Sequence, residues 1–238
     1  MVLSRSKSSA HLHHQRQRLL ARIERRFAIV ADPMQFGPMR FELIRVKDPD
    51  VVLDQVADAG GTAMPYWAEL WESAIGLSRY LIENYTGRSA EILEGKRVLD
   101  LGCGIGLQGS VAARLGAEVL LADIDRDALL FARINTLFAG SRARVRRVDW
   151  QCDDLGEKFD LILGADIVYE RSQWEPLEKF WRGHLQTGGA VLLGEPGRQT
   201  GEEFVEWICA RGWKVAKSEI DAQKKITLMK IRRRDESD

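Results

Sequence analysis

Nine residues, "VLDLGCGIG" at positions 98–106, constrain the fold of this chain more than any other stretch. An apolar run of strand type leads directly into glycines at every second position, Gly102, Gly104 and Gly106. Glycine tolerates positive φ and carries no Cβ to hold a ligand away from the backbone. The pattern therefore predicts the first strand-to-helix turn of a ligand-binding α/β sheet.

The rest of the chain repeats short apolar runs and helical patterns, which is typical of a parallel sheet with crossover helices. The expected strands are 97–101, 118–122, 144–148, 159–163 and 190–194, with helices 108–115, 125–138 and 172–184 between them. A helix at 201–211 precedes two further runs, 214–219 and 225–231. These runs are too close for a parallel crossover, so the last strand should be antiparallel. We predict a Rossmann-like, doubly wound, seven-stranded α/β sheet with an antiparallel last strand.

The residues ahead of this core predict a smaller cap. "MRFELIRV" and "DVVLDQV" flank a turn signal and are expected to form a β-hairpin. In "PYWAELWESAIGLSRYLIEN", large apolar residues recur at helical spacing, which predicts one amphipathic helix. The expected organisation is a basic, flexible or helical arm at 1–30, a hairpin and helix cap at 31–95, and a ligand-binding core at 96–238.

Charge is concentrated at the start of the chain. Residues 1–26 hold seven Lys or Arg against Glu24 alone, while the remainder has 28 basic and 34 acidic residues. A solvated arm, helical over about 15–29, is one interpretation; a nucleic-acid or ribosome contact and an organelle transit peptide are the others. Three scattered cysteines predict neither a disulfide framework nor a metal site, and no run is long enough to span a membrane. We expect a cytoplasmic protein.

Two cofactor classes fit the glycine loop. G-x-G-x-x-G at 104–109 also matches the dinucleotide fingerprint, and Asp123, at the end of the second strand, suits the ribose of either cofactor. Asp100 favours a cationic cofactor over a dinucleotide. A carboxylate at the strand end repels a pyrophosphate, and it can orient the loop and reach a cationic ligand. The long segment before the loop and the antiparallel last strand also argue against a dinucleotide-binding domain.

At this point the chain resembles the class I S-adenosylmethionine-dependent methyltransferases. "VLDLGCGIG" and "LLADIDRDALLFARIN" look like their cofactor loop and ribose-binding segment. "LWESAIGLSRYL", "VDW" and "GADIVYE" are similar to the seven-strand protein-lysine methyltransferase family, which includes nicotinamide N-methyltransferase-like proteins. The resemblance covers residues of about 38–231.

The resemblance implies a role for each matching position. Asp166 and Tyr169 would face the methyl acceptor and orient its nitrogen, and Ala165 would touch the cofactor through its backbone. Asp149 and Trp150 would border the adenine. The candidate cofactor-binding residues are Trp71, Asp100, Gly102, Cys103, Gly104, Gly106, Asp123, Ile124, Asp149, Trp150 and Ala165.

Structural alternatives remain open for several of these residues. Trp71 can belong to the core, Asp166 can cap the next helix, and Tyr169 can be a packed aromatic residue. Cys103 has no base beside it in sequence, which favours a small filler over a nucleophile.

The expected function is S-adenosylmethionine-dependent N-methylation, with a protein lysine as the favoured acceptor. A small amine of nicotinamide type is an alternative, and so is a catalytically silent methyltransferase-fold protein that binds RNA or ribosomes. "ADIVY" replaces the "NPPY"-type tetrad of enzymes that methylate nucleic-acid bases, which argues against such a substrate. The sequence does not identify the acceptor, the number of methyl groups added or the oligomeric state.

Overall fold

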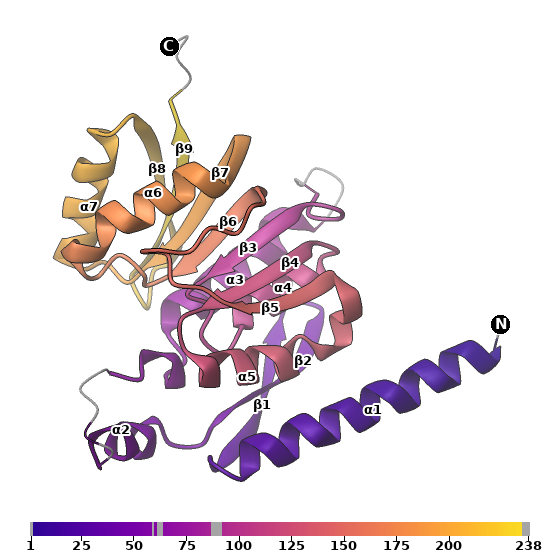
Figure 1. Cartoon of the computed structure of the whole chain (residues 1–238). Coiled ribbons are helices and arrows are strands. Elements are labelled where there is room, and N and C mark those ends of the chain that lie inside the picture. Colours follow the sequence, from indigo (N-terminus) through magenta and orange to yellow (C-terminus); the bar gives the residue numbers. More distant parts are fainter. Residues whose placement is uncertain (1, 59, 61–63, 87–91, 235–238) are drawn as a thin grey trace.

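A seven-stranded mixed sheet forms the centre of the molecule (Figure 1). This computed structural model describes residues 2–58, 60, 64–86 and 92–234. The strand order is β5-β4-β3-β6-β7-β9-β8; β9 is antiparallel to both neighbours, and the other pairs are parallel. The strands are β3 Arg97–Leu101, β4 Glu118–Asp123, β5 Ala143–Arg147, β6 Phe159–Ala165, β7 Leu185–Glu195, β8 Trp213–Asp221 and β9 Ile226–Arg233. The predicted α/β sheet and its antiparallel last strand are confirmed.

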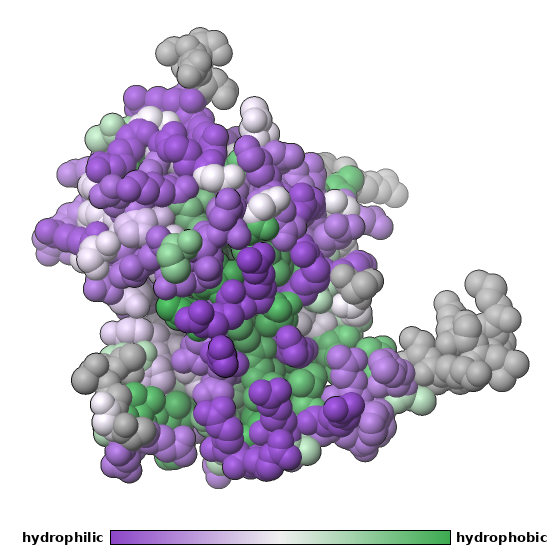
Figure 2. Space-filling model, viewed as in Figure 1, coloured by the Kyte–Doolittle hydropathy of each residue, from purple (hydrophilic) through white to green (hydrophobic). Residues whose placement is uncertain are grey.

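Helices cover both faces of this sheet, which is why its central strands are almost uniformly apolar. In β3, Val98 packs on one side and Leu99 on the other, in two separate clusters of buried residues. The helices on the Val98 side are α3 Glu72–Tyr85, α4 Leu107–Arg114 and α5 Arg126–Asn135, and those on the Leu99 side are α6 Trp174–His184 and α7 Gln199–Cys209. Short 3-10 turns lie at η2 Leu137–Arg142 and η3 Arg171–Gln173. Hydrophilic residues dominate the outer surface of this second pair (Figure 2).

The hairpin ahead of the core uses a different pair of strands from the predicted one. β1 Ile29–Phe36 pairs with β2 Met39–Val46, whereas the stretch "DVVLDQV" lies in a helix, α2 Pro49–Asp58. The Asp48 carboxylate accepts a hydrogen bond from the Asp50 backbone N–H, and Pro49 occupies the first helical position. Both features favour a helix start. The prediction of a second strand here was wrong because this local signal outweighs the apolar run.

The N-terminal helix begins earlier than the predicted range of about 15–29 and also ends earlier. α1 is Val2–Glu24, and its end packs on the core: the Ile23 side chain is fully buried, and in the turn that follows the helix the Arg26 guanidinium pairs with Asp127 of α5. The chain has to leave the helix before β1, whose first residue is Ile29. The C-terminal part of α1 lies beside α5, and Figure 1 shows the helix extending outward from the domain toward the N-terminus.

The tryptophan-rich segment is two elements rather than one continuous helix. A short 3-10 turn, η1 Tyr66–Ala68, is followed by extended backbone, and α3 begins only at Glu72. Trp71 stands at the N-cap position of α3 with φ −70° and ψ 135°. The break allows the side chains of Trp67 and Trp71 to reach the end of the sheet that holds the glycine loop.

Candidate functional site

A cavity of about 250 Å³ lies at the carboxyl ends of β3, β4 and β6, where ligands bind in open α/β sheets. The residues that line it come from the glycine loop, the ends of these strands and the segment ahead of α3: Met64, Tyr66, Trp67, Glu69, Leu70, Trp71, Ala74, Gly102, Cys103, Gly104, Ile105, Leu107, Gln108, Asp123, Ile124, Asp125, Trp150, Ala165, Asp166, Ile167 and Tyr169. Most of the predicted site residues are thus brought together.

The glycine loop has the backbone that its sequence predicts. Gly102, Gly104 and Gly106 have φ values of +63°, +52° and +84°. A Cβ on Gly106 would lie 2.9 Å from Leu121 and 3.0 Å from Ala132, so side chains of β4 and α5 close the space around it. Gly106 therefore holds the loop against the core, and it does not line the cavity.

Asp100 supports the start of α4, the helix that follows the glycine loop. Its fully buried carboxylate accepts hydrogen bonds from Gln108 Nε2 and from the Gly109 backbone N–H, both at 2.9 Å. Burial raises the pKa of this carboxyl from 3.8 to about 7, against the lowering effect of those two bonds. The cavity lining does not include Asp100. Asp100 therefore holds the first turn of α4, directly after the loop, while its action on the loop itself and a direct contact with a ligand stay predictions.

Asp123 joins the end of β4 to the loop at the cavity wall. Its Oδ2 accepts from the Gly104 N–H and its Oδ1 accepts from the Asp125 N–H, each at 2.9 Å. Burial raises the pKa of Asp123, whereas these hydrogen bonds lower it. Ile124 beside it is half exposed. The arrangement presents a carboxylate edge to any hydroxyl group that enters the cavity.

Of the two candidate residues after β5, Asp149 and Trp150, only Trp150 lines the cavity. The Trp150 Nε1 donates to Gln173 Oε1 at 3.1 Å, which fixes the indole. Asp149 was expected beside it, but its Oδ1 accepts from the Gln151 backbone N–H within the turn, and the cavity wall does not include it.

Cys103 has the surroundings of a packed side chain. Its thiol is buried and lies 3.5 Å from the Gly104 carbonyl oxygen. Burial raises the thiol pKa well above its usual range, so the sulfur stays protonated. A nucleophilic role has no support here.

The opposite side of the cavity carries Asp166 directly after β6. Its backbone has φ +54°, a conformation that few non-glycine residues adopt, and its N–H donates to the Gly194 carbonyl at 2.9 Å. The carboxylate does not cap a helix, because η3 begins at Arg171. Instead its Oδ2 accepts from Arg198 Nη2 at 2.9 Å. Burial raises the pKa of Asp166, and the guanidinium opposes that shift.

Aromatic rings form the rim above Asp166. Tyr169 is 38% exposed and stands edge-on to Tyr66, with ring centroids 5.3 Å apart. Trp71 lies 6.3 Å from the Tyr66 ring and donates from its Nε1 to the Tyr66 carbonyl oxygen at 2.9 Å. Trp71 is half-buried and lines the cavity, so the core alternative does not describe it.

These positions agree with a family comparison. The family model described as lysine methyltransferase matches residues 58–209. This chain belongs to the lysine methyltransferase family. The matched range holds the glycine loop, Asp123, Trp150, Asp166 and Tyr169, and it ends in α7.

Several curated proteins are similar to parts of this chain. The electron transfer flavoprotein beta subunit lysine methyltransferase of Danio rerio is 34% identical over 142 residues, which are 58% of this chain and 53% of that protein. Protein N-lysine methyltransferase METTL21A of Danio rerio is 36% identical over 134 residues, 53% and 58% of the two chains. Histidine protein methyltransferase 1 homolog of Dictyostelium discoideum is 32% identical over 52% of this chain and 41% of its own. The chain spans about half the length of the curated relatives it matches.

Solved structures share the fold of this lysine methyltransferase family member. A ribosomal protein L11 methylase from Lactobacillus delbrueckii subsp. bulgaricus has a TM-score of 0.57 at 19% identity, over 70% of this chain and 81% of that one. The glycopeptide N-methyltransferase MtfA complexed with (S)-adenosyl-L-methionine has a TM-score of 0.53 at 15% identity, over 68% and 95%. At these identities the comparison shows the fold alone.

Two rim residues of the family member escaped sequence reasoning, Tyr66 and Arg198. Arg198 belongs to the turn "EPGR" after β7, and β7 is the parallel neighbour of β6. Parallel neighbours end at the same edge of a sheet, so the end of β7 had to lie beside Asp166 once the strand order was known. Tyr66 carried no comparable signal.

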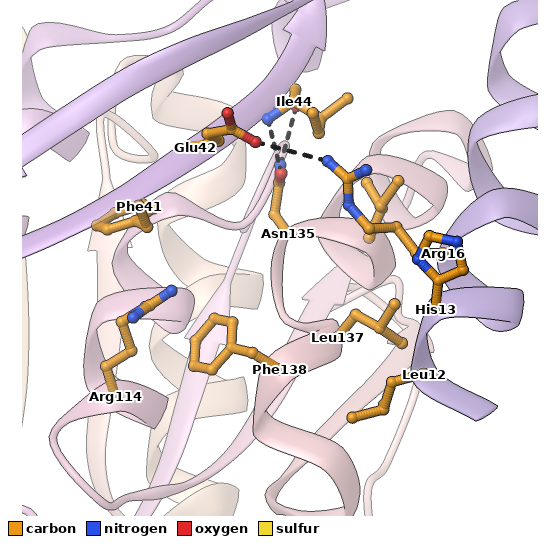
Figure 3. A pocket seen from close by; sticks show the side chains of 11 residues that line it. Leu12, His13, Arg16, Phe41, Glu42, Ile44, Arg114, Asn135, Leu137 and Phe138 are labelled. Atoms are coloured by element: carbon orange, nitrogen blue, oxygen red, sulfur yellow. Dashed lines mark hydrogen bonds and ion pairs between the residues drawn. The ribbon is translucent and has the colours of Figure 1, made fainter. Parts of the chain in front are cut away.

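A second cavity, of about 380 Å³, lies between α1, β2 and the end of α5 (Figure 3). The Asn135 side chain at its floor joins three backbone groups: its Oδ1 accepts from the Ile44 N–H, and its Nδ2 donates to the carbonyls of Ile44 and Ile105. Arg114 lies between the rings of Phe41 and Phe138. These contacts join the hairpin to the core, and no predicted site residue lines this cavity.

Neither a metal site nor a membrane-spanning helix is found in the part of the chain that the structure describes. No group of three or more His, Cys, Asp or Glu side chains there has the arrangement of a metal site. None of its helices combines the length and the apolar character that crossing a membrane requires.

Proposed function

We propose that this chain is an S-adenosylmethionine-dependent methyltransferase that methylates a lysine side chain of a protein. One observation of the cavity carries the cofactor assignment. Among the described residues that line it there are four carboxylates, from Glu69, Asp123, Asp125 and Asp166, and no Lys, Arg or His. Arg198 pairs with Asp166 from outside this lining, so the net charge of the wall rests on the other three carboxylates. Such a wall repels a pyrophosphate and attracts a sulfonium and an amino group. The dinucleotide alternative has no support from this charge pattern.

The residues present fit S-adenosylmethionine. Asp123 would accept hydrogen bonds from ribose hydroxyls, Trp150 would cover a face of the adenine, and the glycine loop would admit the amino-acid end without a Cβ in the way. When bound, this cofactor supplies an activated methyl group, and transfer forms an N–C bond while the sulfonium sulfur keeps the electrons of the broken C–S bond.

The protein's own part in the reaction is to position the acceptor. A free lysine has a pKa of about 10.4, so losing its proton at about pH 7.4 costs roughly 4 kcal/mol. Aromatic walls exclude water and favour the neutral amine. Asp166 and Tyr169 would each accept a hydrogen bond from an N–H of the acceptor amine, which aims the nitrogen lone pair at the methyl group, and the acceptor proton would leave through water.

The lysine acceptor rests on the family match, and the relatives suggest what to test. Purified protein is incubated with S-adenosylmethionine labelled in its methyl group, with separate arms for cell lysate, recombinant electron transfer flavoprotein beta subunit and nicotinamide. Labelled protein is hydrolysed, and methyl-lysine is separated from methyl-histidine. Label in methyl-lysine is the expected result. Label in methyl-histidine, in nicotinamide alone or in no arm contradicts the proposal.

We also propose that the basic end of the arm, defined as Arg18 and Arg22 of α1 and Arg25 in the turn after it, contacts an acidic partner, with RNA as the probe. The i, i+4 spacing of Arg18 and Arg22 places them on one side of the helix. Deleting residues 1–26 would expose the core around Ile23, so the test is the triple change to Gln. The salt dependence of RNA binding should become less steep in this variant. An unchanged slope would remove the basic end of the arm from consideration.

A further inference from the structure

Arg198 is the one charged side chain that reaches Asp166 among the described residues, and it does so from a different element. It stands at the N-cap position of α7, just after β7. Its Nη2 donates to Asp166 Oδ2 at 2.9 Å, and its guanidinium carbon lies 5.9 Å from the centre of the Trp71 ring. The side chain is 40% exposed, whereas that of Asp166 is 5% exposed. The pair thus spans the boundary between the cavity and solvent.

The backbone of Arg198 is held by a buried carboxylate. Glu195 accepts from the Gly197 N–H at 2.6 Å and from the Arg198 N–H at 3.2 Å. A Cβ on Gly201 would lie 2.5 Å from the Glu195 carboxyl carbon, so the first turn of α7 closes over this carboxylate. The chain has built a fixed support for Arg198, and the guanidinium beside Asp166 is not a loosely placed surface charge.

The pairing occupies only half of the Asp166 carboxylate. Arg198 takes Oδ2, and the hydrogen bonds found among the described residues include none to Oδ1. Asp166 lines the cavity, as do Tyr66, Trp71 and Tyr169 of the rim. One acceptor atom is therefore available to a group that enters between these rings.

We propose that Arg198 is a positioning residue that neutralises the charge of Asp166 and leaves Oδ1 to orient an uncharged acceptor amine. This inference rests on the proposed methyl transfer to lysine. A lone carboxylate beside the acceptor would hold the nitrogen as an ammonium, which has no lone pair for the methyl group. A carboxylate paired with arginine still accepts an N–H hydrogen bond while its net charge is cancelled.

Other ionisable groups also face this pair. Desolvation and the nearby carboxylate of Asp166 raise the pKa of Glu195, and desolvation is the main cause of the raised pKa of Tyr169. The remaining groups are Tyr66 and Glu170, which act on Tyr169, and Glu69 of the cavity wall. Arg198 is the only cation in this set, so its removal leaves Asp166 without compensation.

The test compares Arg198→Gln with the wild type in kcat and KM as functions of pH, using the protein that the wild type labels. Gln keeps a hydrogen-bond donor and removes the charge. The acceptor should then bind as an ammonium, so KM falls or stays level. The rise of kcat with pH should move to higher pH by about one unit, which lowers kcat roughly tenfold at pH near 7.5. Arg198→Lys should restore the wild-type pH profile.

A matched control is Arg171→Gln. Arg171 also pairs with a carboxylate, that of Glu203 in α7, but at an exposed place outside the cavity. Its profile should overlie that of the wild type. If Arg198→Gln lowers kcat equally at every pH, or leaves the profile unmoved, the proposal is overturned. If Arg198→Gln does not fold, the pH profile of Arg198→Lys is the test. A role of the charge predicts no shift in that profile, and a shifted profile overturns the proposal. A wild type that labels no protein refutes the proposed function instead.

Discussion

The cavity has two halves that are built in different ways. The half beside the glycine loop comes from one continuous stretch, Arg97–Asp123, in which strand, loop, helix and second strand are linked by hydrogen bonds such as Gly104 N–H to Asp123. The half around Asp166 is assembled from the ends of β6 and β7 and the segment ahead of α3. Local sequence therefore specifies the first half, whereas the second depends on how distant segments meet.

The difference extends to chemistry. The loop half is buried and held by backbone hydrogen bonds, which suits one invariable ligand. The Asp166 half carries exposed aromatic rings and an ion pair at its edge, which suits an acceptor that arrives from outside. If the two halves are separable, substitutions in one should leave the function of the other intact.

The largest effect is expected from Gly106→Ala, which destabilises the backbone of the loop half. A side chain at φ +84° is strained, and the new Cβ would be 2.9 Å from Leu121. Together these should cost about 3 kcal/mol in the free energy of unfolding, measured with urea. Gly212→Ala is the control, since Gly212 has φ +83° with no atom within 4 Å of such a Cβ. Equal losses in both variants would show that packing around Gly106 is unimportant.

Asp166→Ala and Tyr169→Phe change the half around Asp166, where the acceptor would bind. Loss of an orienting group displaces the acceptor nitrogen, and turnover should fall roughly 100-fold for Asp166→Ala. The effect of Tyr169→Phe should be smaller, because only a hydroxyl is removed. The measurement is methyl incorporation at saturating S-adenosylmethionine. Wild-type turnover in both variants would show that these residues do not orient the acceptor.

Asp123→Asn weakens the ligand contacts of the loop half. One ionised hydrogen-bond acceptor for the ribose is lost, which should weaken S-adenosylmethionine binding by about 2 kcal/mol, roughly 30-fold. Turnover at saturating cofactor should change much less. A variant with normal affinity and low turnover would reverse the assignment of the two halves.

The last prediction concerns pH, and its effect is the smallest when counted for one pH unit. The pKa of Asp100 in the folded protein, about 7, lies above its ordinary value of 3.8, so folding takes up a proton between these pH values. The free energy of unfolding should therefore fall as pH rises through this window, by about 1 kcal/mol per unit more than in Asp100→Asn. The check is urea unfolding at several pH values. Parallel pH dependences in the two proteins would contradict this origin.

The sequence predicted what neighbouring residues determine. The strand at 97–101 and the loop with Asp123 were found because apolar runs and glycine spacing are local signals. It missed the strand pairing of β1, which contains Pro33, and mistook α2 for a strand. It assigned Asp166 to the acceptor side but not its partner Arg198, because 32 residues and a helix separate them and only strand order unites them.

The separability of the two halves is tested most directly by calorimetric titration of Asp166→Ala with S-adenosylmethionine. Asp166 interacts with Arg198 and the rim, and within the described residues none of its hydrogen bonds reaches the glycine loop or Asp123. We predict a dissociation constant within about twofold of the wild-type value, together with the loss of methyl transfer described above. A dissociation constant raised tenfold or more would show that Asp166 holds the cofactor, and the division of the cavity into two halves would be wrong.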